Sequence, residues 1–277
     1  MTLRAKNGMQ HKRLAQEIAT LYGKLSEVEG VILGGSEASG RGDTYSDIDL
    51  YVYARDGHIE RNSRAALIQD RAQVYELDNR RWETGDEWIE RDSGVHVDVM
   101  YRDVSWIIDQ IHATLALHHV DLGYSTCIWY NVLHSEALYD RGNWYAGLQH
   151  NARRPYPDAL VTAIVRKNHP VLRKSLSSYL RQIESGVQRD DFVAVNHRIS
   201  ALVASYFDVL FAVNRMPHPG EKRMLEAAEA QCKKRPADLR ELMIELIYGS
   251  DPVVAANELI DRLDDLLIQE GMLPRRM

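Results

Sequence analysis

The 277-residue chain has only two cysteines, Cys127 and Cys232, and neither belongs to a Cys-x-x-Cys pair. Two cysteines so far apart indicate neither a disulfide framework nor a zinc site, so we expect a reducing compartment. No apolar run approaches the ~20 residues that a membrane-spanning helix requires, and the first residues lack the apolar core of a signal peptide. These absences predict a cytoplasmic protein without a membrane segment.

A surplus of basic residues is also missing. The chain has 34 Lys and Arg against 40 Asp and Glu, a formal net charge of −6, and an isoelectric point near 6.0. Nucleic-acid phosphates are neutralised by clustered Lys and Arg, so this balance argues against a nucleic-acid partner. Small polar or cationic partners are compatible with it. The length favours two domains, and 45% hydrophobic residues are enough for their cores.

The stretch from residue 31 to 52, VILGGSEASGRGDTYSDIDLYV, begins with a glycine-rich turn. Its apolar start predicts a buried strand, which Gly34 and Gly35 end in a tight bend. Glycine lets the backbone come close to a phosphate because no Cβ intervenes, and successive N–H groups in such a bend can bind an anion. Ser36 adds a hydroxyl donor. The turn therefore predicts a phosphate-binding site formed by these three residues.

The same stretch ends in a pair of carboxylates, Asp47 and Asp49, which follow Ser36 after ten residues. Side chains alternate along a strand, so both acids lie on one face, with their backbones roughly 7 Å apart. Carboxylate oxygens suit Mg²⁺, which is usually held by one or two such groups together with substrate phosphates. The pair alone could equally be a solvated strand end. Its distance from the glycine turn favours a site for a nucleoside triphosphate and its metal ion.

The order Gly34-Gly35-Ser36, ten residues, then Asp47-Ile48-Asp49-Leu50 resembles the signature of the DNA polymerase β-like nucleotidyltransferase superfamily. The resemblance implies a third carboxylate on a later strand, and the alternating run 95–101, VHVDVMY, offers Asp98. It also implies an α+β fold, in which an N-terminal domain has a mixed sheet with flanking helices and an all-α bundle follows.

The chain further resembles the DUF4037 family of nucleotidyltransferase-like proteins in both halves. In the first half the resemblance rests on the glycine turn, on 46–49 (SDID) and on 98–102 (DVMYR). In the second half it rests on Asn214-Arg215 and on 219–223, PGEKR. It implies an arrangement similar to that of antibiotic adenylyltransferases, and it does not identify the acceptor.

Along the chain, the pattern of apolar residues predicts one domain at 1–145 and a helical, cleft-closing domain at 146–277. The resemblance implies that the first of these is the nucleotidyltransferase domain. In the first domain we expect residues 59–77 to be mostly helical, and 80–93 to lack regular structure because charges and two tryptophans show no clean period. Asp103 is expected to cap a following helix. The second domain is expected to be a bundle of about five helices.

The loop 214–223, NRMPHPGEKR, is the one part of this bundle that suggests chemistry. Lys222 and Arg223 lie where a helix is expected to begin, and the helix dipole disfavours cations there unless an anion is near. We expect them to neutralise the triphosphate or the leaving pyrophosphate from across a cleft. A solvated turn, with Glu221 offsetting the charge, is the alternative.

Together these features predict transfer of a nucleoside monophosphate, AMP being the expected one, from an NTP to a hydroxyl of a small-molecule acceptor. Asp47 and Asp49 would hold Mg²⁺, and Asp98 would hold a second ion or accept the proton of the acceptor. An acceptor on a protein or RNA, or a nucleotide-binding regulator without turnover, are the alternatives. The sequence does not determine the number of metal ions, the identity of the acceptor or the oligomeric state.

Overall fold

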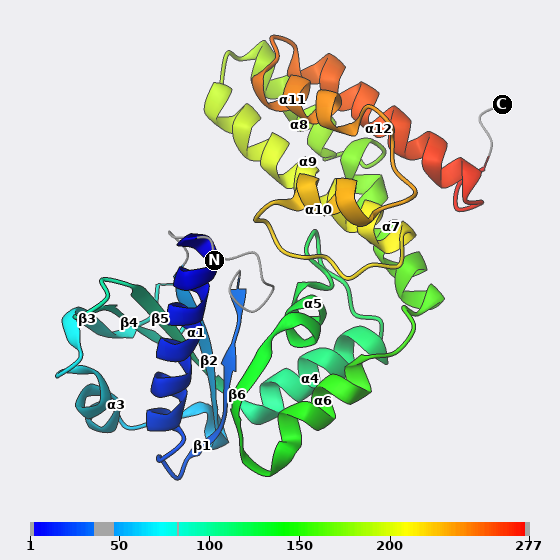
Figure 1. Cartoon of the computed structure of the whole chain (residues 1–277). Helices are drawn as coiled ribbons and strands as arrows, with labels where there is room; N and C mark the ends of the chain where they lie inside the picture. The colour runs from blue at the N-terminus through cyan, green and yellow to red at the C-terminus, as the bar shows by residue number, and fades with distance from the viewer. Residues whose placement is uncertain (1–2, 36–46, 82, 275–277) are drawn as a thin grey trace. The chain divides into compact units, whose positions relative to one another are not determined.

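The computed structural model describes residues 3–35, 47–81 and 83–274 (Figure 1). Contacts divide the chain into two compact units. The N-terminal unit consists of Met1–Ile111 and Asn131–Arg154, and the helical unit consists of His112–Tyr130 and Pro155–Met277. The organisation into two domains that meet near residue 145 remains a prediction.

The described part of the N-terminal unit forms one six-stranded mixed sheet, with strand order β3-β4-β5-β2-β1-β6. Strands β2 and β5 pair in parallel, and the other neighbouring strands pair antiparallel. The strands are β1 (Val28–Leu33), β2 (Ile48–Ala54), β3 (Ala72–Asn79), β4 (Gly85–Glu90), β5 (His96–Asp103) and β6 (Glu136–Asp140). The helices of this unit are α1 (Leu3–Tyr22), α3 (Arg61–Ile68) and α6 (Trp144–Ala152), and it shares α4 (Val104–Leu115) and α5 (Cys127–His134) with the helical unit. This is the α+β architecture expected from the sequence.

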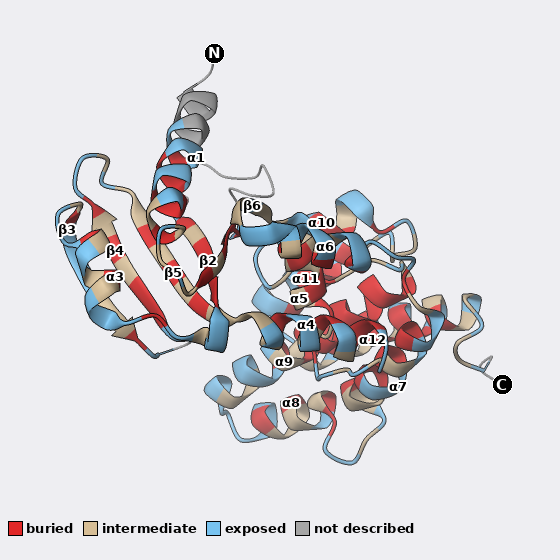
Figure 2. Cartoon of the chain, turned by 90° about the horizontal axis from the view of Figure 1, so that it is seen from below, coloured by how far each residue is buried: buried red, intermediate tan, exposed pale blue. Residues whose placement is uncertain are grey.

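One face of the central strands is apolar and packs with α1. Ile48 and Leu50 of β2, and Val97 and Val99 of β5, are fully buried in the same hydrophobic cluster as Ile18 of α1. Buried residues accordingly run along β2 and β5 in Figure 2. Since strand side chains alternate, the intervening residues of β2 and β5 lie on the opposite face of the sheet.

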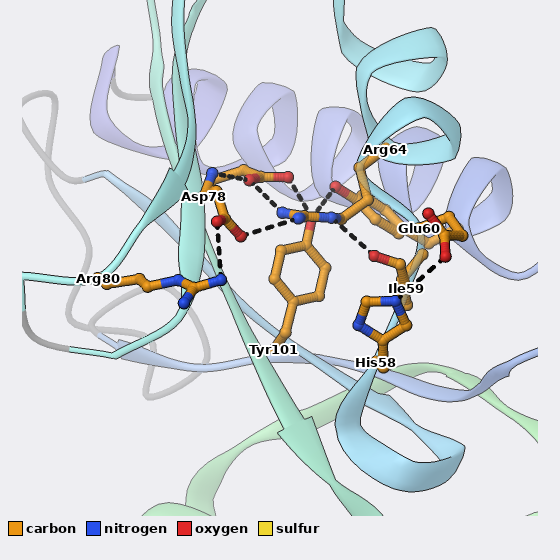
Figure 3. Close-up of polar contacts among 9 residues, drawn as sticks. His58, Ile59, Glu60, Arg64, Asp78, Arg80 and Tyr101 are labelled. Atoms are coloured by element: carbon orange, nitrogen blue, oxygen red, sulfur yellow. Dashed lines mark hydrogen bonds and ion pairs between the residues drawn. The ribbon is translucent and has the colours of Figure 1, made fainter.

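A buried polar network fixes α3 and the edge of the sheet (Figure 3). The Arg64 guanidinium of α3 donates to the buried carboxylate of Asp86 on β4 and to Asp78, 3.1 Å away. The Tyr101 hydroxyl donates to the other Asp86 oxygen at 2.7 Å, and it lies 2.6 Å from the Tyr22 hydroxyl. Asp86 is therefore tolerated inside the core because a cation and a hydroxyl neutralise and solvate it.

The structure corrects the expectations for residues 59–93. The predicted helix at 59–77 is wrong in its second half, because α3 ends at Ile68 and β3 begins at Ala72. The segment 80–93, expected to be irregular, contains β4 (Gly85–Glu90). Asp103 does cap α4 as expected, since its carboxylate accepts from the backbone N–H of Trp106 at 3.1 Å.

In the helical unit, the described residues after 155 form six α-helices. These are α7 (Asp158–Arg173), α8 (Tyr179–Gln188), α9 (Phe192–Val213), α10 (Met224–Gln231), α11 (Leu239–Tyr248) and α12 (Pro252–Gln269). The bundle thus has one helix more than the number expected. None of the helices in the described part of the chain combines the length and apolar character that crossing a membrane requires.

Candidate active site

The parallel pairing of β2 with β5 brings two of the predicted acids together. Asp49 is directly opposite Asp98 in the register, on the face that does not carry the buried Ile48 and Val97 side chains. Neighbouring strands lie about 4.8 Å apart, so the two carboxylates occupy adjacent positions. Asp47 lies just before β2, with a side chain 52% exposed. The structure thus places Asp49 and Asp98 side by side and Asp47 at the start of the same strand.

The predicted glycine turn lies directly against this acid pair. The Gly34 N–H donates to the Asp49 carbonyl oxygen at 2.9 Å. Gly35 has φ +62°, and a Cβ at this position would lie 1.9 Å from Oδ2 of Asp49. Only glycine fits there, because an L side chain would both strain the backbone and displace the carboxylate. Ser36, the third predicted member of the turn, lies outside the described residues.

Two functional candidates, Glu87 and His96, were missed in the sequence. Glu87 of β4 is directly opposite Asp98, on the side away from Asp49. His96 lies between acids, with Nδ1 3.4 Å from Oδ1 of Asp47 and Nε2 3.5 Å from Oε2 of Glu87. The signal that could have found Glu87 is the Ser93-Gly94 turn before the Asp98 strand, which is typical of a hairpin with a preceding strand.

The environment of this face disfavours the ionised form of Asp98. Burial raises the pKa of Asp98 to about 6, and the negative charges of Glu87, Asp49 and Asp47 add to the rise while His96 opposes it. Each of the three neighbouring carboxylates favours the protonated form of Asp98 because like charges repel. Binding of a cation would relieve the repulsion and favour the carboxylate.

The donor chemistry fits Mg²⁺ when part of the coordination comes from a substrate. Within 3–35, 47–81 and 83–274, no group of three or more His, Cys, Asp or Glu is arranged to hold a metal ion. Mg²⁺ bound to a nucleotide needs only one or two protein carboxylates, because phosphates and waters complete its octahedron. The adjacent Asp49 and Asp98 can supply that number.

Lys222 and Arg223 lie in the helical unit, both exposed, at the beginning of α10 (Met224–Gln231). Arg223 occupies the N-cap position with φ 57°, a left-handed conformation that is uncommon for a non-glycine residue. The two cations are therefore at a helix N-terminus, where the sequence predicts them. Their contact with a triphosphate stays a prediction.

The loop that precedes them is anchored by a buried histidine that sequence reasoning missed. Nδ1 of His218 accepts from the Gly220 N–H at 3.1 Å and lies 3.3 Å from Sγ of Cys127. The ring packs edge-on against the rings of Tyr124 and Phe211, at 4.9 and 5.0 Å between centroids. Burial lowers the pKa of His218 to about 4, so it is neutral near pH 7. Its role is to fix the loop.

Comparison with known proteins identifies the class of the N-terminal part. Residues 11–120 match the family model described as the nucleotidyltransferase domain. This match covers less than half of the chain, and for the matched residues it supports the polymerase β-like superfamily. The protein is accordingly an enzyme of the nucleotidyltransferase class, with an NTP as substrate.

Solved structures with a similar chain course include two proteins. A nucleotidyltransferase-like protein from Exiguobacterium sibiricum 255-15 has 11% identity and a TM-score of 0.45, over 94% of this chain and 75% of that one. A STING-associated CdnE c-di-GMP synthase from Capnocytophaga granulosa has 14% identity and a TM-score of 0.33, over 99% and 85%. Likeness at these TM-scores establishes neither a shared fold nor a shared substrate. No curated protein matches the chain.

Proposed function

We propose that the protein transfers a nucleoside monophosphate, AMP in the first instance, from an NTP to a hydroxyl of a small molecule. The observation that carries the proposal is the register of β2 and β5. It sets Asp49 beside Asp98, with the Gly34-Gly35 bend against Asp49. A polyphosphate bound at the bend would lie next to carboxylates able to share its metal ion.

The acids would hold Mg²⁺, with Asp47 and Asp49 as the primary ligands and Asp98 as a further ligand or as the proton acceptor. When bound, the ion neutralises charge on the phosphates and stabilises the attacking and leaving oxygens. The bend at Gly34 and Gly35, together with Ser36, would bind phosphate oxygens through N–H and O–H donors. Lys222 and Arg223 would neutralise the triphosphate or the leaving pyrophosphate.

In the proposed reaction, the acceptor hydroxyl oxygen forms a bond to the α-phosphorus and the bond from that phosphorus to the β-phosphate oxygen breaks. Pyrophosphate leaves with the electron pair of the broken bond. The hydroxyl proton passes to Asp98 or to water. Asp98 can take it only within about 2.6–3.2 Å of the hydroxyl or through one water, and a pKa near 6 is suited to a base at neutral pH.

The charge of the site supports a cationic acceptor. Glu87 adds a carboxylate beside Asp98, and the chain as a whole has a net charge of −6. Such a surface attracts cations, both the Mg²⁺ that accompanies the NTP and a positively charged acceptor. We therefore propose a cationic, hydroxyl-bearing small molecule of the kind that antibiotic adenylyltransferases modify as the acceptor. The free thiols of Cys127 and Cys232 are consistent with the cytoplasmic location that we propose for the protein.

The proposal is tested by pyrophosphate release from the purified chain. Each NTP is combined with cationic and neutral hydroxyl acceptors, with Mg²⁺ or with EDTA. We expect Mg²⁺-dependent release that requires an acceptor and is lost in Asp47→Asn and Asp49→Asn. Asp109→Asn, which alters an exposed acid of α4, should retain activity. NTP binding without release from any acceptor would indicate a regulator instead, and release only with protein or RNA acceptors would exclude a small-molecule enzyme.

A further inference from the structure

Tyr51 is the residue that lies directly beneath the glycine bend. It follows Asp49 by two positions in β2, so both side chains are on the same face of the sheet. A Cβ built on Gly34 would lie 2.4 Å from Cε2 and 3.0 Å from Cζ of the Tyr51 ring. The backbone of Gly34 therefore rests against the ring itself. Gly34 is glycine because the ring occupies the space that a side chain would need.

The Tyr51 ring is in turn held from two other directions. The Asn131 amide of α5 donates to its hydroxyl at 2.9 Å. The Arg102 guanidinium lies 4.1 Å above the ring centroid, and two hydrogen bonds of 2.8 Å to the Glu83 carboxylate fix that guanidinium. Both contacts are stronger where water is excluded, and the Tyr51 side chain is buried. The ring is thus a rigid support rather than a freely rotating core side chain.

An ordinary core tyrosine of the same unit shows what is special about this position. Tyr145 is fully buried, and its hydroxyl lies 2.7 Å from Oγ of Ser135. It therefore has the same kind of single hydroxyl hydrogen bond. Its ring, unlike that of Tyr51, contributes none of the three atoms nearest to a Cβ built on Gly34 or on Gly35. If Tyr51 only stabilised the fold, replacing Tyr51 or Tyr145 would have the same effect on nucleotide binding.

We propose that Tyr51, braced by Asn131 and Arg102, is a positioning residue that holds the Gly34-Gly35 bend in its phosphate-binding conformation. The inference rests on the proposed function. A bend that adopts this conformation only part of the time binds the NTP more weakly in proportion to that fraction. Loosening Tyr51 therefore raises the KM for the NTP and leaves the KM for the acceptor unchanged.

The first test compares Tyr51→Phe with Tyr145→Phe, because each removes one buried hydroxyl and keeps the ring. We measure thermal unfolding, the Mg²⁺-dependent Kd for ATP by calorimetry, and the KM values for ATP and acceptor. A lost hydrogen bond of ordinary strength corresponds to about a fivefold change in an equilibrium constant. We expect Tyr51→Phe to weaken ATP binding by about fivefold. Tyr145→Phe should lower the melting temperature with no change in Kd.

The second test is a steric rescue. The φ of Gly34 is not in the left-handed region, and within the described residues the three atoms nearest to a Cβ there all belong to Tyr51. Gly34→Ala should weaken ATP binding strongly, and Tyr51→Ala should weaken it on its own. The double variant should bind more tightly than the product of the two single effects. Gly35→Ala serves as the control, because its clash is with Asp49 and Tyr51→Ala cannot relieve it.

The outcomes separate this inference from the proposed function. If the wild-type chain binds no nucleotide, the proposed function fails and the role of Tyr51 fails with it. If the wild type binds ATP and Tyr51→Phe binds equally well, Tyr51 is a structural residue only. Multiplicative effects in the Gly34→Ala and Tyr51→Ala double variant would likewise overturn the inference, since residues in contact are expected to be coupled. Because Kd is measured directly, neither outcome depends on finding the acceptor.

Discussion

Replacing Asp98 by asparagine removes one negative charge from a face on which several acids gather, so it should stabilise the protein without divalent ions. In the folded chain Asp98 keeps its proton up to about pH 6, whereas the ordinary value is 3.8. Between these values the folded state binds more protons than the unfolded state. Stability therefore falls as the pH rises from about 4 to 6 and stays lower above pH 6.

The expected gain in the free energy of unfolding follows from the pKa shift of Asp98. About two pKa units at roughly 1.4 kcal/mol each give an upper limit of about 3 kcal/mol. Asp98 is only half-buried, so solvent screening should reduce the cost to about 1–2 kcal/mol. Asparagine does not titrate. The Asp98→Asn variant should therefore gain about 1–2 kcal/mol over the wild type between pH 4 and pH 7.

Urea unfolding of both proteins in EDTA across this pH range measures the difference directly, and other titrating groups cancel in it. Asp109→Asn, which alters an exposed acid of α4, is the control variant. Added Mg²⁺ should stabilise the wild type more than Asp98→Asn. A wild-type-minus-variant difference that does not change with pH would refute the reasoning, because neither burial nor the neighbouring acids would then raise the pKa of Asp98.

Three further predictions concern other parts of the chain. Gly35→Ala should abolish nucleotide transfer and destabilise the fold by about 1–2 kcal/mol, because both its left-handed φ and the neighbouring Asp49 side chain oppose a Cβ. An activity assay measures the first effect and urea unfolding measures the second. Arg64→Met should cost about 3–5 kcal/mol, because Asp86 would remain buried without its cation, and unchanged stability would contradict this. His218 titrates in the unfolded chain near its usual pKa of 6.5 but near 4 in the fold. Relative to His218→Gln, the wild type should lose up to about 3 kcal/mol of stability as the pH falls from 6.5 to 4.

The central strands were predictable because their residues obey simple alternation. In β2 and β5 every second residue is apolar and buried, so the opposite face had to carry Asp49 and Asp98. Alternation says which face an acid occupies but not which strands are neighbours. The adjacency of the two acids was expected only from the resemblance to a known superfamily.

Strand β4 was missed because its buried face is not apolar. Asp86 and Glu90 point to the same side as Trp88, and all three are buried. Because two of these three residues are acidic, the apolar alternation that would predict a strand is absent. A carboxylate is tolerated in the core only where a partner such as Arg64 reaches it. That partner comes from a different element, and no local pattern reveals it. With β4 overlooked, Glu87 could not be assigned to the site.

The anchoring of the 214–223 loop was equally out of reach. His218 looks like any loop histidine in the sequence, and its ring packs against Phe211 of α9 and against Tyr124, which is distant in the chain. The sequence predicts a phosphate-neutralising role for Lys222 and Arg223 of this loop, and that role stays a prediction. Their positions at the start of α10 follow from the local pattern, because a helix boundary is a local property.

The parallel pairing of β2 with β5 also has a consequence for the order of folding. Strand β2 cannot meet β5 until the chain between them, with α3 and the β3–β4 hairpin, has been synthesised and has closed on itself. Pairing over such a separation is slow, because the entropy of closing the intervening chain is lost before the strands gain contacts. The acids therefore come together late in refolding, so recovery of catalytic power should lag behind recovery of helical circular dichroism.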